Sequence, residues 1–78
     1  MTDSPETQLI ETLWRNRNTP MHRDDVMTLL DYPSPKVEPI CAYALFQNHV
    51  IRANRTLAKK GFQIKREAGE FYRIGALS

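Results

Sequence analysis

The chain has 78 residues, of which 41% are hydrophobic and 26% are charged, and its formal net charge is +2. These values are ordinary for a globular domain and exclude a disordered, collagen-like or disulfide-rich chain. A chain of this length forms one small domain with a thin core, which disfavours an enzyme with a deep, dry pocket. We therefore expect a module that works through its surface.

Three features predict a cytoplasmic protein. Cys41 is the single cysteine, so the chain cannot form an internal disulfide. No run of 18 or more apolar residues is present that would span a membrane. The segment from Met1 to Glu6 lacks the basic start and apolar stretch of a signal peptide.

The charge is unevenly distributed along the chain. Residues 1–50 hold four basic and seven acidic residues, whereas residues 51–78 hold seven basic and two acidic ones. A positive electrostatic field concentrated at one end of the chain attracts polyanions, of which nucleic acid is the commonest. A solvated basic surface without a ligand is the alternative explanation.

The first predicted helix runs from Pro5 to about Arg17. Ser4 suits the N-cap, and proline suits the first helical position because no amide donor is needed there. The spacing of four apolar residues predicts one buried stripe on this helix: Leu9, Ile10, Leu13 and Trp14.

A short second helix is predicted from about Arg23 to Asp31. Asp24 and Asp25 occupy its first turn, where the helix dipole favours negative charge. Its predicted apolar side consists of Val26, Leu29 and Leu30. The loop from Tyr32 to Lys36 contains two prolines, which end the helix and stiffen the connection.

The third predicted helix begins near Pro39 and continues to Lys59 or Lys60, and Gly61 follows as the C′ residue. Helical periodicity places five apolar residues on one buried side: Ala42, Phe46, Val50, Ala53 and Leu57. It places five others on the opposite side: Asn48, Ile51, Arg52, Arg55 and Lys59. The pattern leaves open whether the helix is continuous near Tyr43 to Gln47.

Beyond the third predicted helix, the pattern of residues changes from the helical period to the two-residue period of strands. Two runs, 62–67 and 71–74, flank Ala68-Gly69-Glu70 and predict a β-hairpin that must pack on the helices to be stable. The fold class is therefore mainly α with a C-terminal β-hairpin. This order is that of a three-helix winged helix-turn-helix. We expect it to form a single domain over 1–78, with 1–4 and 76–78 as loose tails.

Three segments resemble the effector domains of response regulators of the OmpR/PhoB type. Residues 21–26 resemble the start of their second helix, 49–57 their recognition helix and 64–74 their wing. The resemblance covers most of residues 8–75 and implies a freestanding winged helix without a receiver domain. Asn54 and Ala68 stand where the family usually has arginine, and Phe71 replaces the glycine before the wing tyrosine.

The outward side of the third helix is the candidate DNA-binding site. Asn48, Arg52, Arg55 and Lys59 are spaced four, three and four residues apart, so they line one side of a helix. In a major groove arginine reads guanine and asparagine reads adenine, while a lysine suits a phosphate. Ile51 is a candidate contact to a thymine methyl. An exposed polar surface is the alternative interpretation.

The predicted hairpin carries three further candidates, Lys65, Arg66 and Arg73. In a wing they would contact flanking phosphates or the minor groove. Strand alternation places Lys65 and Arg66 on opposite faces, so only one of these two is expected to contact DNA. Charges that keep an edge strand soluble are the alternative interpretation.

The remaining candidates have structural interpretations. We expect Trp14 in the core, Phe71 and Tyr72 between wing and helices, and His49 as a buried, hydrogen-bonded histidine. Tyr43 is a candidate exposed aromatic. No acid–base pair, metal-ligand spacing or nucleotide-binding glycine loop is present, so neither an enzyme nor a cofactor or metal is expected.

Together these patterns predict a small DNA-binding transcriptional regulator whose partner is double-stranded DNA. One domain of this size makes a small footprint on DNA, so useful specificity calls for two copies, as a homodimer or on tandem sites. The alternative is a protein-interaction module of the same fold that binds RNA polymerase or another regulator. Neither alternative involves a membrane.

Overall fold

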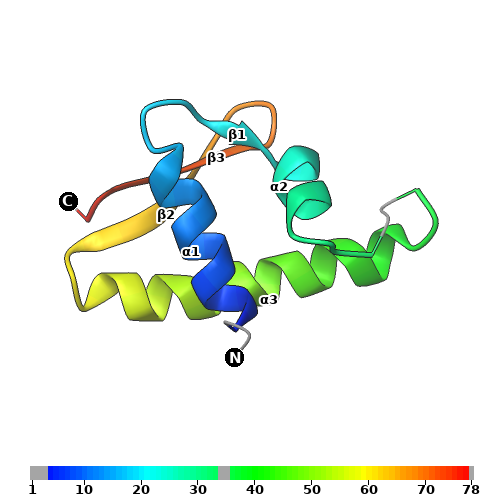
Figure 1. Ribbon diagram of the computed structural model, residues 1–78, viewed down its shortest axis with the longest axis horizontal. Coiled ribbons are helices and arrows are strands. Elements are labelled where there is room, and N and C mark those ends of the chain that lie inside the picture. The colour runs from blue at the N-terminus through cyan, green and yellow to red at the C-terminus, as the bar shows by residue number, and fades with distance from the viewer. Residues whose placement is uncertain (1–3, 34–35, 78) are drawn as a thin grey trace.

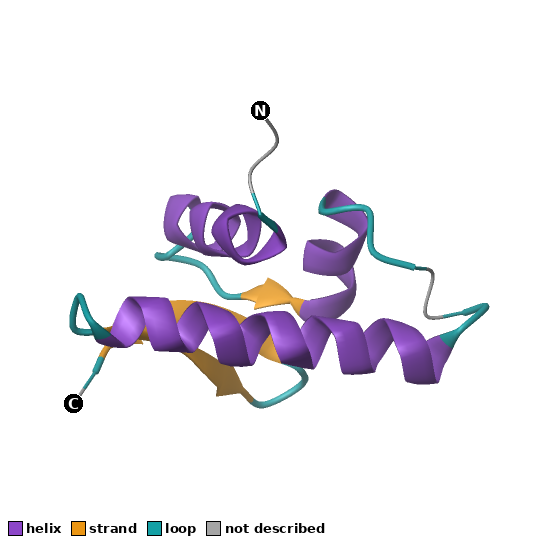
Figure 2. Ribbon diagram, turned by 90° about the horizontal axis from the view of Figure 1, so that it is seen from below, coloured by secondary structure: helices purple, strands orange, loops and turns teal. Residues whose placement is uncertain are grey.

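The computed structural model describes residues 4–33 and 36–77 and contains three helices and a three-stranded antiparallel sheet. The elements follow the order α1 (Pro5–Arg15), β1 (Met21–His22), α2 (Arg23–Leu29), α3 (Pro39–Ala58), β2 (Phe62–Glu67) and β3 (Phe71–Ala76). The longest helix, α3, runs along one edge of the molecule, and α1 and α2 lie above it in Figure 1. In Figure 2, which views the molecule from below, α1 and α2 lie above α3 and the hairpin passes behind it.

Helix α1 begins as predicted. The Ser4 hydroxyl accepts a hydrogen bond from the Thr7 amide at 3.3 Å, and Pro5 follows the cap. The helix ends at Arg15, two residues early, where the Asn16 side chain donates to the carbonyl of Thr12 at 2.8 Å. Ser4 is therefore not part of a loose tail. Residues 1–3 and 78, also predicted as tails, lie outside the described residues.

The predicted apolar stripe of α1 is only partly buried. Leu9 and Leu13 are in the core, whereas Trp14 is 41% exposed, so the prediction that it is a core residue is wrong. Trp14 lies at the edge of the core, where its ring meets the edge of the Phe62 ring at 5.3 Å between centroids.

Strand β1 was not predicted. Its two residues pair with β3, Met21 with Tyr72 and His22 with Phe71, so β3 is the middle strand of the sheet. His22 also caps α2, because its Nδ1 accepts a hydrogen bond from the Asp24 amide at 3.1 Å. The strand thus connects the sheet directly to the start of α2.

Helix α2 ends at Leu29, two residues before the predicted end, and Asp31 adopts a positive φ of 58°. Val26 and Met27 are buried, whereas Leu29 is 61% exposed, contrary to the prediction. The buried side is centred on Val26, Met27 and the half-buried Leu30, and Leu29 projects about 110° away from that centre.

Helix α3 is continuous from Pro39 to Ala58, which settles the question left open by its sequence. All five residues of its predicted apolar stripe are buried. Lys59 is the C-cap, so Gly61, which takes the left-handed conformation at φ +83°, stands at C″ and not at the predicted C′. Phe46 is completely buried at the centre of the core, with its ring against those of Tyr32 and Tyr72.

The hairpin forms as predicted, and β2 and β3 pair with Ile64 opposite Ile74 and Arg66 opposite Tyr72. Ile64, Tyr72 and Ile74 are buried, and Ala76 belongs to β3 instead of a loose tail. Phe71 does not pack between wing and helices. Strand alternation places it on the face opposite Tyr72, where it is 38% exposed and meets the His22 ring.

The loop between α2 and α3 is described only in part. Tyr32 packs against the core and Pro33 is half-buried, whereas Ser34 and Pro35, part of the predicted stiff loop, lie outside the described residues.

Candidate nucleic-acid interface

The five candidate residues of α3 lie together on its outward side. Asn48, Arg52, Arg55 and Lys59 are exposed, and Ile51 is 51% exposed. Each lies across the helix from the buried stripe. Seen from below, α3 lies in front of the sheet, and no described element lies between it and the viewer (Figure 2). The helix therefore presents a row of amide, apolar and cationic side chains to solvent.

Arg52 is also part of an ion pair. Its guanidinium donates to the carboxylate of Glu6 at 3.2 Å, which connects the middle of α3 to the first turn of α1. The pKa of Glu6 is lowered, first by a backbone hydrogen bond and then by Arg52. The carboxylate partly neutralises Arg52, which makes it a weaker cation toward an anionic ligand than its position suggests.

Asn54 has a structural role that sequence reasoning missed. Its side-chain oxygen accepts a hydrogen bond from the Ile64 amide at 2.7 Å, so it fastens β2 to α3. The residue is half-buried and turned toward the hairpin. The position therefore holds the hairpin against the helix.

Replacing Asn54 with alanine should lower the free energy of unfolding by about 1–3 kcal/mol, because the Ile64 amide loses its acceptor in a partly buried place. Asn48→Ala is the matched control, since Asn48 is exposed on the same helix, and it should change stability by less than about 0.5 kcal/mol. Urea denaturation measures both values. Equal losses in the two variants would contradict the structural role of Asn54.

The hairpin cations are mostly paired with carboxylates. Arg66 pairs with Glu70 across the turn, and Arg73 pairs with Glu67. Lys65 lies opposite Arg73 on the outer face, and Arg66 lies opposite Tyr72, which confirms that Lys65 and Arg66 are on opposite faces. Within the described residues, Lys65 has no ion pair. Lys65 is therefore the hairpin cation most available to a ligand.

The tip of the hairpin is joined to the start of α2. Arg23 donates to Glu70 at 3.2 Å, so this carboxylate holds both Arg23 and Arg66. The Arg23 guanidinium also lies over the Tyr43 ring, 3.8 Å from its centroid. Tyr43 also packs against the core, so it is half-buried and is not the exposed aromatic that was expected.

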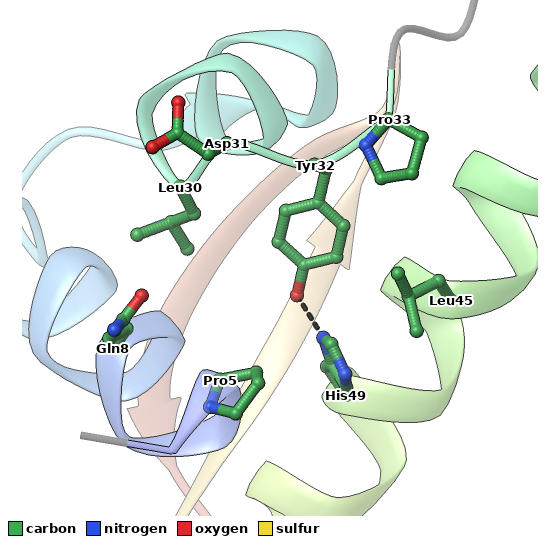
Figure 3. A pocket seen from close by; sticks show the side chains of 8 residues that line it. All are labelled: Pro5, Gln8, Leu30, Asp31, Tyr32, Pro33, Leu45 and His49. Atoms are coloured by element: carbon green, nitrogen blue, oxygen red, sulfur yellow. Dashed lines mark hydrogen bonds between the residues drawn. The ribbon is translucent and has the colours of Figure 1, made fainter. Parts of the chain in front are cut away.

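His49 is buried and hydrogen-bonded, as predicted. The Tyr32 hydroxyl and His49 Nδ1 share a hydrogen bond that closes one side of a hollow of about 180 Å³ between α1, α3 and the loop after α2 (Figure 3). Burial lowers the pKa of His49, and Arg52 adds to the decrease while Glu6 opposes it. Burial also raises the pKa of Tyr32 to about 12. Both side chains are therefore neutral near neutral pH.

The free energy of unfolding should fall as the pH drops below 6.5, the ordinary pKa of histidine. In that range the unfolded chain binds a proton at residue 49 while the folded chain resists it, so the unfolded state gains stability. Glu6 acts only at more acidic pH, because its lowered pKa adds stability above 4.5 that is lost below that value. Denaturation between about pH 7.5 and about pH 5 measures the slope, which should be flatter in His49→Gln. An unchanged slope in the variant would contradict the role of His49.

A comparison with models of known protein families, with curated proteins and with solved structures finds no match to this chain. Among the described residues, no three His, Cys, Asp or Glu side chains are grouped so as to hold a metal ion. None of the helices in the described part of the chain is long and apolar enough to cross a membrane.

Proposed function

We propose that this chain is a winged helix-turn-helix protein that binds double-stranded DNA and regulates transcription. The order of the elements supports this, with a short strand between the first two helices and a hairpin after the third. The sheet order β1-β3-β2 fits it as well, since the hairpin is then attached to the helices through β1. In this proposal α2 and α3 form the helix-turn-helix, and β2 and β3 form the wing.

The outward side of α3 is the observation that carries the proposal. Asn48, Ile51, Arg55 and Lys59 are all exposed on one side of a continuous helix, and the core holds the opposite side rigidly. An α-helix fits the major groove, where these residue types have partners. Arg55 would read guanine, Asn48 adenine and Ile51 a thymine methyl, whereas Lys59 would contact a phosphate.

The wing has a smaller part in this mechanism. Glu67 and Glu70 neutralise Arg73 and Arg66, so among the residues that the structure describes Lys65 is the hairpin cation without an ion pair. A duplex would have to break these ion pairs to use the paired arginines. Affinity would therefore come mainly from α3, with Lys65 as a phosphate contact beside it.

Salt dependence tests the proposal. With Lys59, Lys65 and a partly neutralised Arg52 at the backbone of the duplex, about two to three phosphates would be neutralised. The logarithm of the binding constant should then fall with the logarithm of salt concentration at a slope of about −2 to −3. Titrations of a labelled duplex at several salt concentrations measure the slope. A slope near zero, or no binding at low salt, would exclude the proposed DNA interface.

A protein-interaction module of the same fold is the second candidate, with RNA polymerase or another regulator as its partner. The observation that favours it is the first half of α3, which has no Asp, Glu, Lys or Arg from Pro39 to Ile51 and exposes Ile40 to 84%. Binding of a purified candidate partner after nuclease treatment, together with no binding to duplex at low salt, would favour this function over the first.

A further inference from the structure

The exposed side of α3 has two chemically different halves. Its second half carries Arg52, Arg55 and Lys59, whereas its first half exposes Ile40, Ala44 and the uncharged Gln47. Val37, just before the helix, is 78% exposed. Large apolar side chains gathered on so small a domain indicate an interaction surface. Binding to DNA phosphates does not explain the first half of α3, because this half carries no cationic side chain.

The arrangement of charges along α3 is complementary to itself. The exposed Glu38 stands at the N-terminal end, and Arg55 stands 17 residues further along, about 26 Å away on a helix. If two copies of α3 lie antiparallel, each Glu38 comes level with the Arg55 of the other copy. The two copies of Arg55 then stay about 26 Å apart, beyond the screening length of about 10 Å, so they do not repel.

The same antiparallel register matches the apolar side chains. Residue 51 of one copy comes level with residue 42 of the other, so Ile51 lies over the segment between Ile40 and Ala44. The small side chain of Ala44 lets the two helices approach closely. An isologous two-fold contact requires a surface that complements itself, and this surface meets that requirement in both charge and apolar contacts.

We propose that a second copy of this chain docks antiparallel on the exposed side of α3, and that this dimer competes with DNA. The competition rests on the proposed function, because Ile51 and Arg55 would be used by both partners. The self-association does not depend on the proposed function. In the dimer the second copy covers the side chains that would read DNA. A duplex must displace that copy before it can contact them.

The area available predicts a weak dimer. The exposed side of α3 is about 30 Å long and about 10 Å wide, or about 300 Å² from each copy. Stable complexes bury about 800 Å² from each partner. A dissociation constant on the order of 100 µM is therefore expected, which makes the dimer dependent on concentration and easy for a duplex to displace.

A charge exchange tests the dimer without DNA. Glu38→Lys and Arg55→Glu should each reduce self-association, because each homodimer then places like charges at both ends. An equimolar mixture of the two variants restores both pairs and should dimerise at least as well as the wild type. Sedimentation at about 10 µM to 1 mM measures this, and circular dichroism checks that each variant is folded. Two folded variants that stay monomeric when mixed, or a wild type that is monomeric throughout, would overturn the proposal.

A neutral variant tests the competition. Ile40→Ser removes apolar contact without changing charge, and serine is about as favourable in a helix as isoleucine. It should weaken the dimer about tenfold, whereas Leu77→Ser, at an exposed leucine beyond β3, should leave it unchanged. Adding a duplex to wild-type dimers should give complexes with one protein copy each. If the protein stays dimeric and the duplex stays unbound, the DNA function is contradicted but the dimer is not. If the duplex binds dimers that still pair through α3, the competition is contradicted.

Discussion

Replacing Phe46 with alanine is expected to lower the free energy of unfolding by about 3–5 kcal/mol. Phe46 is completely buried, and its ring meets the edges of the Tyr32 and Tyr72 rings. The substitution removes these contacts and leaves a cavity where α3, the loop after α2 and the sheet meet. A domain of this size has a total stability of roughly 4–12 kcal/mol, so the substitution removes a large share of it.

The matched control for this prediction is Ile51→Ala, on the same helix but on its exposed side. It should cost less than about 1 kcal/mol, because a half-exposed side chain leaves no cavity behind. Chemical denaturation of the two variants therefore reports how α3 is rotated about its axis. Similar losses in both would mean that the outward side of the helix has been assigned incorrectly.

Replacing Arg55 with alanine should reduce affinity for a preferred duplex by about 1–3 kcal/mol, or about 5- to 150-fold. Arg55 is exposed at the middle of the cationic half of α3 and has no ion pair within the described ranges 4–33 and 36–77, so its charge is available to DNA. If it reads a guanine, the variant should also lose part of its preference among base sequences. Competition titrations with duplexes that differ at single positions measure both effects.

Lys59→Ala separates a phosphate contact from a base contact. It should weaken binding to all sequences alike and reduce the salt slope by about 1. Arg15→Ala removes the same charge from the last turn of α1, at a residue that is not part of the proposed interface, and serves as the control. Equal effects of all three substitutions would mean that binding reflects total charge and not the outward side of α3.

The third helix was predictable because its signal is local and long. Twenty residues follow one helical period, and this fixes both the buried stripe with Phe46 and the opposite side with Arg55. The N-cap at Ser4 was predictable for the same reason, since the cap bonds to a residue three positions away. The hairpin followed from two runs of strand-forming residues around a glycine.

The unpredicted features depend on contacts that are distant along the chain. Strand β1 has two residues and no periodicity, and it pairs with β3 about fifty residues later. The Arg52–Glu6 pair and the bond from Ile64 to Asn54 arise only once α1, α3 and β2 are packed together. Trp14 was wrongly predicted to be a core residue, because periodicity shows which side of a helix is buried but not where along the helix the core ends. The Arg66–Glu70 pair did have a local signal, since the predicted turn brings these two residues together.

The most direct test of the proposed DNA interface is an NMR titration of the labelled protein with a short duplex at low salt. The amide and side-chain signals of Asn48 through Lys59 should shift, together with that of Lys65, and added salt should reverse the shifts. The signals of Ile10, Trp14 and Phe62, which line a separate hollow, should stay in place. No shifts on α3, or shifts confined to the hollow beside Trp14, would contradict DNA binding by the outward side of this helix.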